Sequence, residues 1–270
     1  MQSLHISWSP MEATYNYTIT KIKGGKKFPF EDTLIREIKL DIVVNDEKIA
    51  SLMATPVDQE ALVVGYLMSE NIIASVDDIK EVFLKNDGMT VEIIAKINGD
   101  AVQRLNTEGV VISGCGRSKT ANIDVDKMDA LVNTCDFHIS ADLISEEMNG
   151  FFQYCKLYEQ TGSVHTAKLY LAGGEFFIAE DIAQHSTVDK VIGKAKLAGI
   201  DTTNAALMVS GRLSSEMVAK AVMHQIPILI SRTASTCLGV QIAEKFGLTL
   251  VGFARENRMN IYTHDRRIDV

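Results

Sequence analysis

The chain has 270 residues, of which 46% are hydrophobic and 23% charged, and its formal net charge is −8. These proportions are typical of a globular protein with one large domain or two smaller ones, and the acidic balance argues against non-specific nucleic-acid binding as a main role. No apolar run is long enough to span a membrane, and no basic segment followed by an apolar core marks a secretion signal.

The cysteine content points to a reducing compartment. There are four cysteines, and no pair has the Cys-x-x-Cys spacing of a zinc knuckle or ribbon. Disulfides are rare in proteins of the cytosol, and a large chain with few cysteines fits that setting. We therefore expect a cytoplasmic protein without a structural zinc and without a membrane anchor.

The first part of the chain predicts an arm followed by a small α+β domain. Residues 1–30 lack a clear period, and we expect a poorly structured arm there. Residues 31–105 contain two predicted hairpins, 38–54 and 79–97, the second turning at an Asn-Asp-Gly sequence. Between them, Thr55 followed by a proline predicts the capped start of a helix, whose small residues allow close packing.

The second part, residues 106–270, predicts a larger α/β domain after a polar boundary stretch at 98–109. We expect a long helix over 141–159 capped by Ser140, with Cys155 in the core, and a hairpin over 166–179. A helix beginning at Ser186 should follow. Beyond residue 204, continuous apolar strands alternate with helices, a pattern that predicts parallel βαβ units.

Cys115 is the first candidate for chemistry. It lies between two glycines at the end of a short apolar run, and Arg117 and Lys119 follow closely. Glycines expose the backbone, and nearby cations favour the thiolate over the thiol. A free cysteine is otherwise usually a buried small hydrophobe. The sequence alone leaves both interpretations open: a nucleophile or sulfur carrier, and a packed side chain.

The ends of the three predicted parallel strands form a second candidate site, because ligands bind beyond the carboxyl ends of such strands. Each end contains arginine, in Ser210-Gly211-Arg212, Ser231-Arg232 and Ala254-Arg255-Glu256-Asn257-Arg258. Arginine and the N-termini of the following helices suit phosphate. A ligand with several phosphates is predicted, although the hydroxyl residues would cap helices in any case. No dinucleotide-fold or P-loop glycine motif occurs.

The sequence leaves the roles of two histidines open. His165 follows Thr161-Gly162, and His185 follows the acidic stretch Glu180-Asp181. Either imidazole could act in acid–base chemistry or bind an anion. Alternatively, His165 satisfies a hydrogen bond in the core, and His185 or Asp181 caps the next helix.

Several ordered motifs resemble those of the formate dehydrogenase accessory sulfurtransferases, the FdhD-like family. The resemblance covers about residues 30–268. The motifs are Met53-Ala54-Thr55-Pro56-Val57-Asp58-Gln59-Glu60, Gly114-Cys115-Gly116, Thr161-Gly162-x-x-His165, Glu180-Asp181-Ile182-x-x-His185-x-x-Val188-Asp189-Lys190, Ser210-Gly211-Arg212-x-Ser214-x-Glu216-Met217-Val218-x-Lys220 and Leu248-Thr249-Leu250-Val251-Gly252-Phe253.

The resemblance implies a sulfurtransferase. It implies that Cys115 accepts sulfur from a cysteine desulfurase as a persulfide and passes it to the bis-molybdopterin guanine dinucleotide molybdenum cofactor. That cofactor is destined for the catalytic subunit of formate dehydrogenase. The resemblance further implies a three-layer C-terminal domain like cytidine deaminase, a homodimer, and cofactor binding by Phe253, Ala254, Arg255, Glu256, Asn257 and Arg258. His165, Ser210, Arg212 and Ser231 are predicted to support the site.

The sequence departs from the family pattern at two places. Ser118 stands where the family often has a second cysteine, and Gln184 stands where an arginine is common. One thiolate suffices to hold a persulfide, so Cys115 remains the predicted carrier, while Gln184 removes one anion contact.

Two other classes of function compete with the sulfur carrier. A zinc deaminase needs His-x-Glu and Pro-Cys-x-x-Cys, and neither occurs. A non-catalytic chaperone that delivers the molybdenum cofactor without moving sulfur remains open, and Ser118 favours it.

Overall fold

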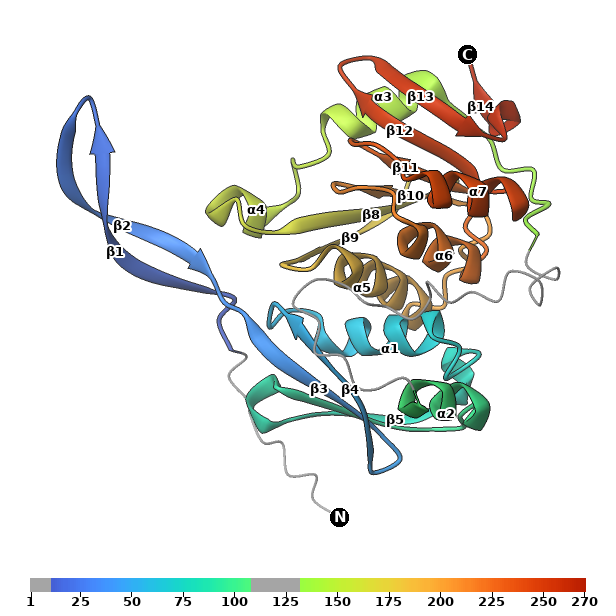
Figure 1. Cartoon of the computed structure of the whole chain (residues 1–270), viewed down its shortest axis with the longest axis horizontal. Helices are drawn as coiled ribbons and strands as arrows, with labels where there is room; N and C mark the ends of the chain where they lie inside the picture. The colour runs from blue at the N-terminus through green and yellow to red at the C-terminus, as the bar shows by residue number, and fades with distance from the viewer. Residues whose placement is uncertain (1–10, 108–131) are drawn as a thin grey trace.

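The computed structural model describes residues 11–107 and 132–270, which form two packed units and a hairpin that projects from them (Figure 1). The hairpin consists of β1 (Thr14–Lys23) and β2 (Lys26–Ile35). Gly24 and Gly25 form its turn with φ of 58° and 75°. The expectation of a poorly structured arm is therefore wrong for residues 14–30. Threonine, tyrosine and isoleucine favour strands, and the Gly-Gly turn pairs them.

The first unit is a four-stranded sheet with the strand order β4-β3-β6-β5. Both predicted hairpins are confirmed, and α1 and α2 complete the unit. Its elements are β3 (Ile38–Val44), β4 (Glu47–Ala54), α1 (Gln59–Ser69), the short 3-10 turns η1 (Val76–Asp78) and η2 (Asn86–Gly88), β5 (Ile79–Lys85), β6 (Thr90–Ala95) and α2 (Gly99–Thr107).

One prediction for this unit needs correction. The first helix starts at Gln59 rather than beside Thr55, because Asp58 adopts a left-handed conformation with φ of 54°. The polar stretch near which we place the domain boundary contains α2, for which the sequence made no prediction. Ala101 and Val102 are buried in the core of the first unit, and this burial stabilises a helix that also contains several polar residues.

The second unit is a six-stranded sheet with the strand order β13-β12-β11-β10-β8-β9. The predicted parallel pairing of β10, β11 and β12 is confirmed. Its main elements are α3 (Ala141–Asn149), α4 (Lys156–Thr161), β8 (His165–Leu171), β9 (Phe176–Asp181), α5 (Gln184–Leu197), β10 (Ala205–Val209), α6 (Ser215–Met223), β11 (Ile228–Ser231), α7 (Cys237–Lys245), β12 (Thr249–Arg255) and β13 (Arg258–Thr263). The small strands β7 (Ile139–Ser140) and β14 (Ile268–Asp269) pair beside it, and η6 (Asp265–Arg267) precedes the latter.

This sheet lies between two layers of helices. Alternate residues of β10 point to opposite faces, so Leu207 packs with residues of α5, α6 and α7, while Met208 packs with residues of α3. The three-layer arrangement is thus present, and a specific likeness to cytidine deaminase stays a prediction. Among the described residues, no helix is both long and apolar enough to cross a membrane.

Two helix predictions in the second unit are also wrong in their bounds. The long helix expected over 141–159 is two helices, because α3 ends before Gly150 and α4 begins after Cys155. The predicted cap by Ser140 is confirmed: its hydroxyl accepts the Leu143 N–H at 3.2 Å. Cys155 is buried, as expected. The next helix begins at Gln184, so Ser186 lies inside α5 rather than at its cap.

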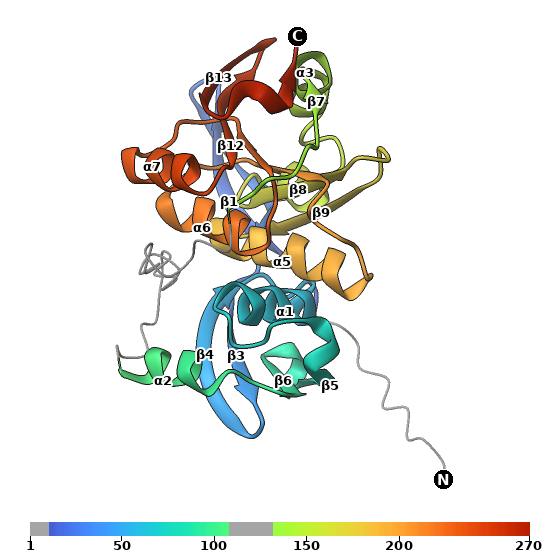
Figure 2. The same ribbon diagram turned by 90° about the vertical axis from the view of Figure 1, so that its right-hand side faces the viewer.

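The two units meet through α1 and α5, which lie against each other (Figures 1 and 2). Gly65 and Gly193 make this contact possible. A Cβ atom at Gly65 would lie 2.0 Å from the Asp189 carbonyl oxygen, and one at Gly193 would lie 1.9 Å from the Ala61 carbonyl oxygen. The backbones can approach this closely only because neither glycine has a side chain.

Candidate functional site

The loops that follow β10, β11 and β12 meet at one edge of the large sheet. The Leu213 N–H donates to the Ala234 carbonyl and the Phe253 N–H donates to the Thr233 carbonyl, each at 3.0 Å. The structure therefore brings together the three strand ends that the sequence singled out. We call residues 210–214, 231–236 and 253–258 the strand-end edge.

Ser231 connects two loops of the strand-end edge through buried hydrogen bonds. Its side chain is fully buried, its hydroxyl donates to the Gly211 carbonyl at 2.6 Å, and it accepts the Thr233 N–H at 2.9 Å. The predicted supporting role is thus one of holding two loops in register. The hydroxyl is already engaged within the protein.

Two helix N-termini open at the same edge. The Ser214 hydroxyl accepts the Met217 N–H at 3.5 Å at the start of α6, and the Thr236 hydroxyl accepts the Gly239 N–H at 3.1 Å at the start of α7. The remaining N–H groups of the first turns and the helix dipoles give this edge a positive potential. Together the two helices supply an environment that suits an anion.

The four arginines of the edge have different surroundings. Arg212 is exposed, and Arg258 is exposed with a distance of 3.9 Å from its Nη2 to Glu256 Oε2. Arg232 donates to the Met148 carbonyl, and its guanidinium lies 5.3 Å from the centre of the Phe152 ring. Arg212 and Arg258 are therefore open to a ligand, while Arg232 is used in packing.

Arg255 contributes a buried hydrogen-bond donor to the strand-end edge. Its Nε is buried and makes no hydrogen bond within the part of the chain that the structure describes. A buried donor without an acceptor is unfavourable, so such an atom marks a place where a further acceptor belongs.

The predicted cofactor segment, residues 253–258, is the end of β12 and its turn into β13. Glu256 and Asn257 form the turn with φ of 53° and 57°, and Ala254 is buried in the core. An open pocket of about 560 Å³ lies beside this turn, against α3. It is lined by Ala141, Asp142, Ser145, Glu146, Asn149, Asn257, Arg258 and Met259.

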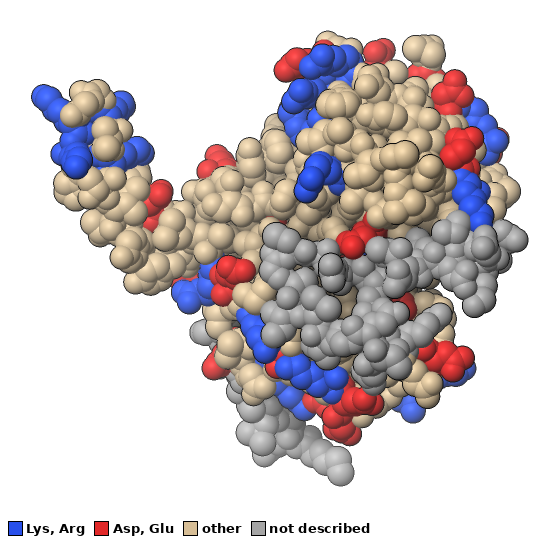
Figure 3. Space-filling view, in the orientation of Figure 1, with Lys and Arg blue, Asp and Glu red and all other residues tan. Residues whose placement is uncertain are grey.

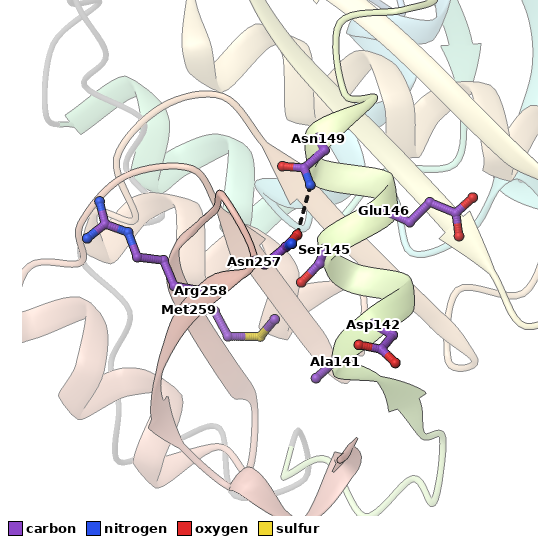
Figure 4. A pocket seen from close by; sticks show the side chains of 8 residues that line it. All are labelled: Ala141, Asp142, Ser145, Glu146, Asn149, Asn257, Arg258 and Met259. Atoms are coloured by element: carbon purple, nitrogen blue, oxygen red, sulfur yellow. Dashed lines mark hydrogen bonds between the residues drawn. The ribbon is translucent and has the colours of Figure 1, made fainter.

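This pocket does not suit phosphates. Asp142 and Glu146 line its α3 side, and carboxylates repel a polyanion. Asn149 donates to the Asn257 side-chain oxygen at 3.1 Å, while Arg258 extends away from the helix (Figure 4). Arg258 is the only basic residue among those that line the pocket, and its side chain points away from the acidic α3 side.

His165 joins the edge through Ser210. Its Nδ1 lies 3.2 Å from the Ser210 Oγ, which also accepts the Thr166 N–H at 3.0 Å. Since that oxygen already accepts one hydrogen bond, we assign its own hydrogen to Nδ1, which leaves the ring hydrogen on Nε2. Burial, and then the charge of His185, lower the pKa of His165. The ring is therefore neutral at pH 7 and can donate from Nε2.

His185 faces an acidic partner that the sequence did not reveal. Its Nδ1 lies 2.8 Å from Glu216 Oε2, and neither atom hydrogen-bonds elsewhere among the described residues. Glu216 is in the first turn of α6, and His185 is in the first turn of α5. Sequence patterns within one element could not predict this pair, because the two helices meet only in the folded chain.

Gln184 supports the loop after β10. Its Nε2 donates to the Arg212 carbonyl at 2.6 Å. A Cβ on Gly211 would lie 2.4 Å from the Gln184 side chain, so this glycine leaves room for it. The residue that departs from the family pattern is therefore a packing and hydrogen-bonding support of the edge.

Other motif residues hold the two units together instead of lining the edge. Lys190 lies 2.7 Å from Asp181, both fully buried, and Thr55 donates to the same carboxylate at 2.9 Å. Lys220 donates to both oxygens of Asp189 at 2.8 Å. These motif residues therefore form buried ion pairs in the interior of the protein.

Cys115 and Ser118 lie outside the described residues, so the predicted persulfide cysteine has no structural account. Within the described ranges there is no cluster of three or more histidine, cysteine, aspartate or glutamate residues that could hold a metal ion.

Comparison with known proteins identifies the family. The model of the FdhD/NarQ family matches residues 35–269. This chain belongs to the FdhD/NarQ family. The sulfur carrier protein FdhD of Wolinella succinogenes is 45% identical over 240 residues, covering 89% of this chain and 84% of that protein. The sulfur carrier protein FdhD of Sulfolobus acidocaldarius is 36% identical over 259 residues, covering 93% and 97%.

The fold of this chain is also similar to that of a solved structure. A provisionally assigned formate dehydrogenase accessory protein from Desulfotalea psychrophila matches with a TM-score of 0.79 and 26% identity. The match covers 96% of this chain and 100% of that one. The family predicted from the sequence motifs is thereby confirmed.

Proposed function

We propose that this protein is a sulfur carrier for formate dehydrogenase. It accepts sulfur from a cysteine desulfurase on Cys115 and passes it to the bis-molybdopterin guanine dinucleotide molybdenum cofactor, its substrate. The observation that supports this most directly is the strand-end edge. Exposed Arg212 and Arg258 and the N-termini of α6 and α7 converge there in a member of a family whose relatives are named sulfur carriers.

The first step is a thiol–persulfide exchange. The Cys115 thiolate attacks the outer sulfur of the desulfurase persulfide, a new S–S bond forms on Cys115, and the desulfurase cysteine leaves as a thiolate. One S–S bond is exchanged for another, so the step needs no external oxidant or reductant. The positive charge of Arg117 and Lys119 favours the attacking thiolate.

The edge then holds the cofactor by its phosphates. Arg212 and Arg258 bind phosphate oxygens as planar donors, and the helix N-termini add backbone N–H groups. The unpartnered Nε of Arg255 gains an acceptor. The segment from Phe253 to Arg258 forms one wall of this site, and neutral His165 donates from Nε2 to the sulfur or to a cofactor oxygen.

The proposal also places the protein in the cytoplasm, in contact with the catalytic subunit of formate dehydrogenase. The competing function is a cofactor chaperone that moves no sulfur. Ser118, in place of a second cysteine, is the observation that favours it. The two functions differ in whether sulfur becomes bound to Cys115.

Intact-protein mass spectrometry tests this difference. The full chain is incubated with an active cysteine desulfurase and cysteine, beside Cys115→Ala and Cys237→Ala. Cys237 is an exposed cysteine and therefore a matched control. We expect the wild type and Cys237→Ala to gain the mass of one sulfur atom and Cys115→Ala to gain none. No gain in any of the three proteins would support the chaperone instead.

A further inference from the structure

His165 and His185 flank the first loop of the strand-end edge. His165, at the start of β8, contacts Ser210 through its Nδ1. Gln184, next to His185 in the first turn of α5, donates to the Arg212 carbonyl. Burial, and then the charge of His185, lower the pKa of His165, so the two rings are near neighbours. The proposed function uses His165 and gives His185 no role.

Glu216 fixes the tautomer of His185. The Nδ1 of His185 and the Oε2 of Glu216 are 2.8 Å apart, and both atoms are buried without another hydrogen-bond partner among the described residues. A carboxylate has only acceptor positions, and two acceptor atoms this close would repel each other. The hydrogen therefore lies on Nδ1, which leaves the lone pair of the neutral ring on Nε2.

The accessible side of the His185 ring is thus an acceptor. The side chain is 22% exposed although its Nδ1 is buried, so the exposure belongs to the rest of the ring, which contains Nε2. His165 has the opposite tautomer, because Ser210 donates to its Nδ1 and its own hydrogen is on Nε2. The two rings offer one acceptor and one donor beside the same loop.

Glu216 is also the group that balances a positive charge on His185. α5 packs against α1, α6, β8 and β9. The ionisable residues that these elements and the loop after β10 carry in this region are Glu70, His165, Glu180, Asp181, Arg212, Glu216 and Lys220. Asp181 and Lys220 are already paired in the interior, and Glu180 accepts N–H groups of α4. The lysines at the far end of the β1–β2 hairpin are separated from this region by open space (Figure 3).

A thiol is the acid that fits this arrangement. The phosphates of a nucleotide are already anionic at neutral pH and offer no proton of this kind. A cysteine thiol, with an ordinary pKa of about 8.5, is mainly protonated there. Only the thiolate attacks a persulfide, so removal of the thiol proton is a necessary step of sulfur uptake.

We propose that His185 is the proton acceptor of the strand-end edge and that Glu216 is its positioning residue. The proton of a thiol moves to Nε2, the sulfur becomes a thiolate, and the Glu216 carboxylate balances the imidazolium; no other bond changes. His165 donates its Nε2 hydrogen to the thiolate. The inference rests on the proposed function, in which Cys115 supplies that thiol.

The pH dependence of thiol alkylation tests the proposal. Peptide mass spectrometry follows the reaction of Cys115 with iodoacetamide in the full chain from about pH 5 to about pH 10. We expect His185→Gln to raise the midpoint of the rate profile by at least about one pH unit, since a nearby opposite charge shifts such a midpoint by about 1–3 units. In His185→Ala, imidazole added to the buffer should restore the rate at neutral pH, because it replaces the missing ring.

Glu216→Gln tests the positioning residue. It keeps the shape of the side chain and an acceptor oxygen but removes the charge that balances the imidazolium. The midpoint should therefore rise in the same direction as in His185→Gln. His138→Gln is the matched control, because His138 contacts Asp136 and Asp269 instead, and its profile should equal that of the wild type. Circular dichroism confirms that each variant is folded.

Nuclear magnetic resonance gives a readout that does not depend on Cys115. Long-range ¹H–¹⁵N spectra of the protein with ¹⁵N-labelled histidine distinguish the two tautomers of a neutral ring. We expect the hydrogen on Nδ1 in His185 and on Nε2 in His165. A hydrogen on Nε2 of neutral His185 would overturn the proposal.

Equal alkylation profiles in the wild type, His185→Gln and Glu216→Gln would also overturn it. Sulfur loading by a desulfurase judges the proposed function separately. If Cys115 gains sulfur while the profiles are equal, the sulfur carrier stands and His185 is not its base. If the profiles shift while no sulfur is gained, His185 is the proton acceptor and the sulfur-carrier function fails.

Discussion

Lys220 of α6 and Asp189 of α5 form an ion pair in the interior of the protein. The Ser69 hydroxyl of α1 donates to the same carboxylate at 2.7 Å, so the pair also joins the two units. A buried charge that loses its partner is costly, whereas replacing both charges is often nearly neutral.

Lys220→Met therefore tests this arrangement. It leaves the Asp189 carboxylate buried without its cation, and we expect the free energy of unfolding to fall by about 3–5 kcal/mol. Adding Asp189→Asn removes the stranded charge and keeps an acceptor for Ser69. Urea denaturation should show that the double variant recovers most of the loss; equal losses in both variants would contradict this account.

His224 gives the protein a predictable acid sensitivity. Burial, followed by the charges of Lys196 and Lys220, lowers its pKa to about 3, and its Nε2 lies 3.1 Å from the Ser69 Oγ. The unfolded chain has an ordinary histidine pKa near 6.5 and so binds a proton first as pH falls. Stability is therefore lost progressively from about pH 6.5 down to about pH 3.

His224→Gln should flatten this dependence. Glutamine can still hydrogen-bond Ser69 but does not titrate, so the variant should lose less stability than the wild type between pH 6.5 and pH 4. Thermal unfolding midpoints at several pH values measure the difference. His138→Gln is the control: hydrogen bonds to Asp269 and then Asp136 raise the pKa of exposed His138, so its loss should not flatten the curve. A flattened curve in that variant would show that His224 is not the cause.

At the scale of elements, the α1–α5 contact depends on two glycines. We expect Gly193→Ala to separate the helices and to lower the free energy of unfolding by about 3 kcal/mol, since overpacking a tight contact commonly costs 1–3 kcal/mol and here a backbone atom is in the way. Gly99→Ala in α2 meets open space and should be neutral or slightly stabilising. Chemical denaturation measures the free energy of unfolding of both variants. Equal values would mean that the α1–α5 contact accommodates the added methyl group, which contradicts the prediction.

The helix starts show why tertiary contacts override local signals. Thr55-Pro56 has the composition of a helix start, but Thr55 instead binds Asp181 and Lys190 of the other unit. Ser186 is likewise a typical cap, yet it is buried within α5. In both cases the preference of a side chain for a cap is worth about 1 kcal/mol, and the packing of the surrounding residues overrides it.

At the scale of the whole molecule, an acidic protein presents exposed arginines at one sheet edge. If this edge binds phosphates, Arg212→Ala with Arg258→Ala should weaken binding of a guanine nucleotide diphosphate by at least about tenfold, because hydrogen bonds to charged groups contribute about 1.5–3 kcal/mol. Titration calorimetry at two salt concentrations measures this, and binding of the wild type should weaken as salt rises.

Arg266→Ala is the matched control for that prediction. Arg266 is exposed and lies in η6, beyond the opposite end of β13, so its loss changes net charge without changing the strand-end edge. Equal weakening in both variants would mean that net charge, and not the edge, governs binding.

The parallel β10–β11–β12 core, both hairpins of the first unit and the convergence of three strand ends could be predicted from the sequence, because they depend on local periodicity and on the rule that parallel strands end at one edge. The family could be predicted from the resemblance of its ordered motifs. The tertiary structure alone decided that Ser231 is internal, that Arg232 packs on Phe152, and that His185 meets Glu216. It also revealed that the motif residues Asp181, Asp189, Lys190 and Lys220 are buried ion pairs. The reason is physical: a charged or polar residue has the same sequence signature whether it binds a ligand or another side chain, and only the packing of distant elements decides which partner it meets.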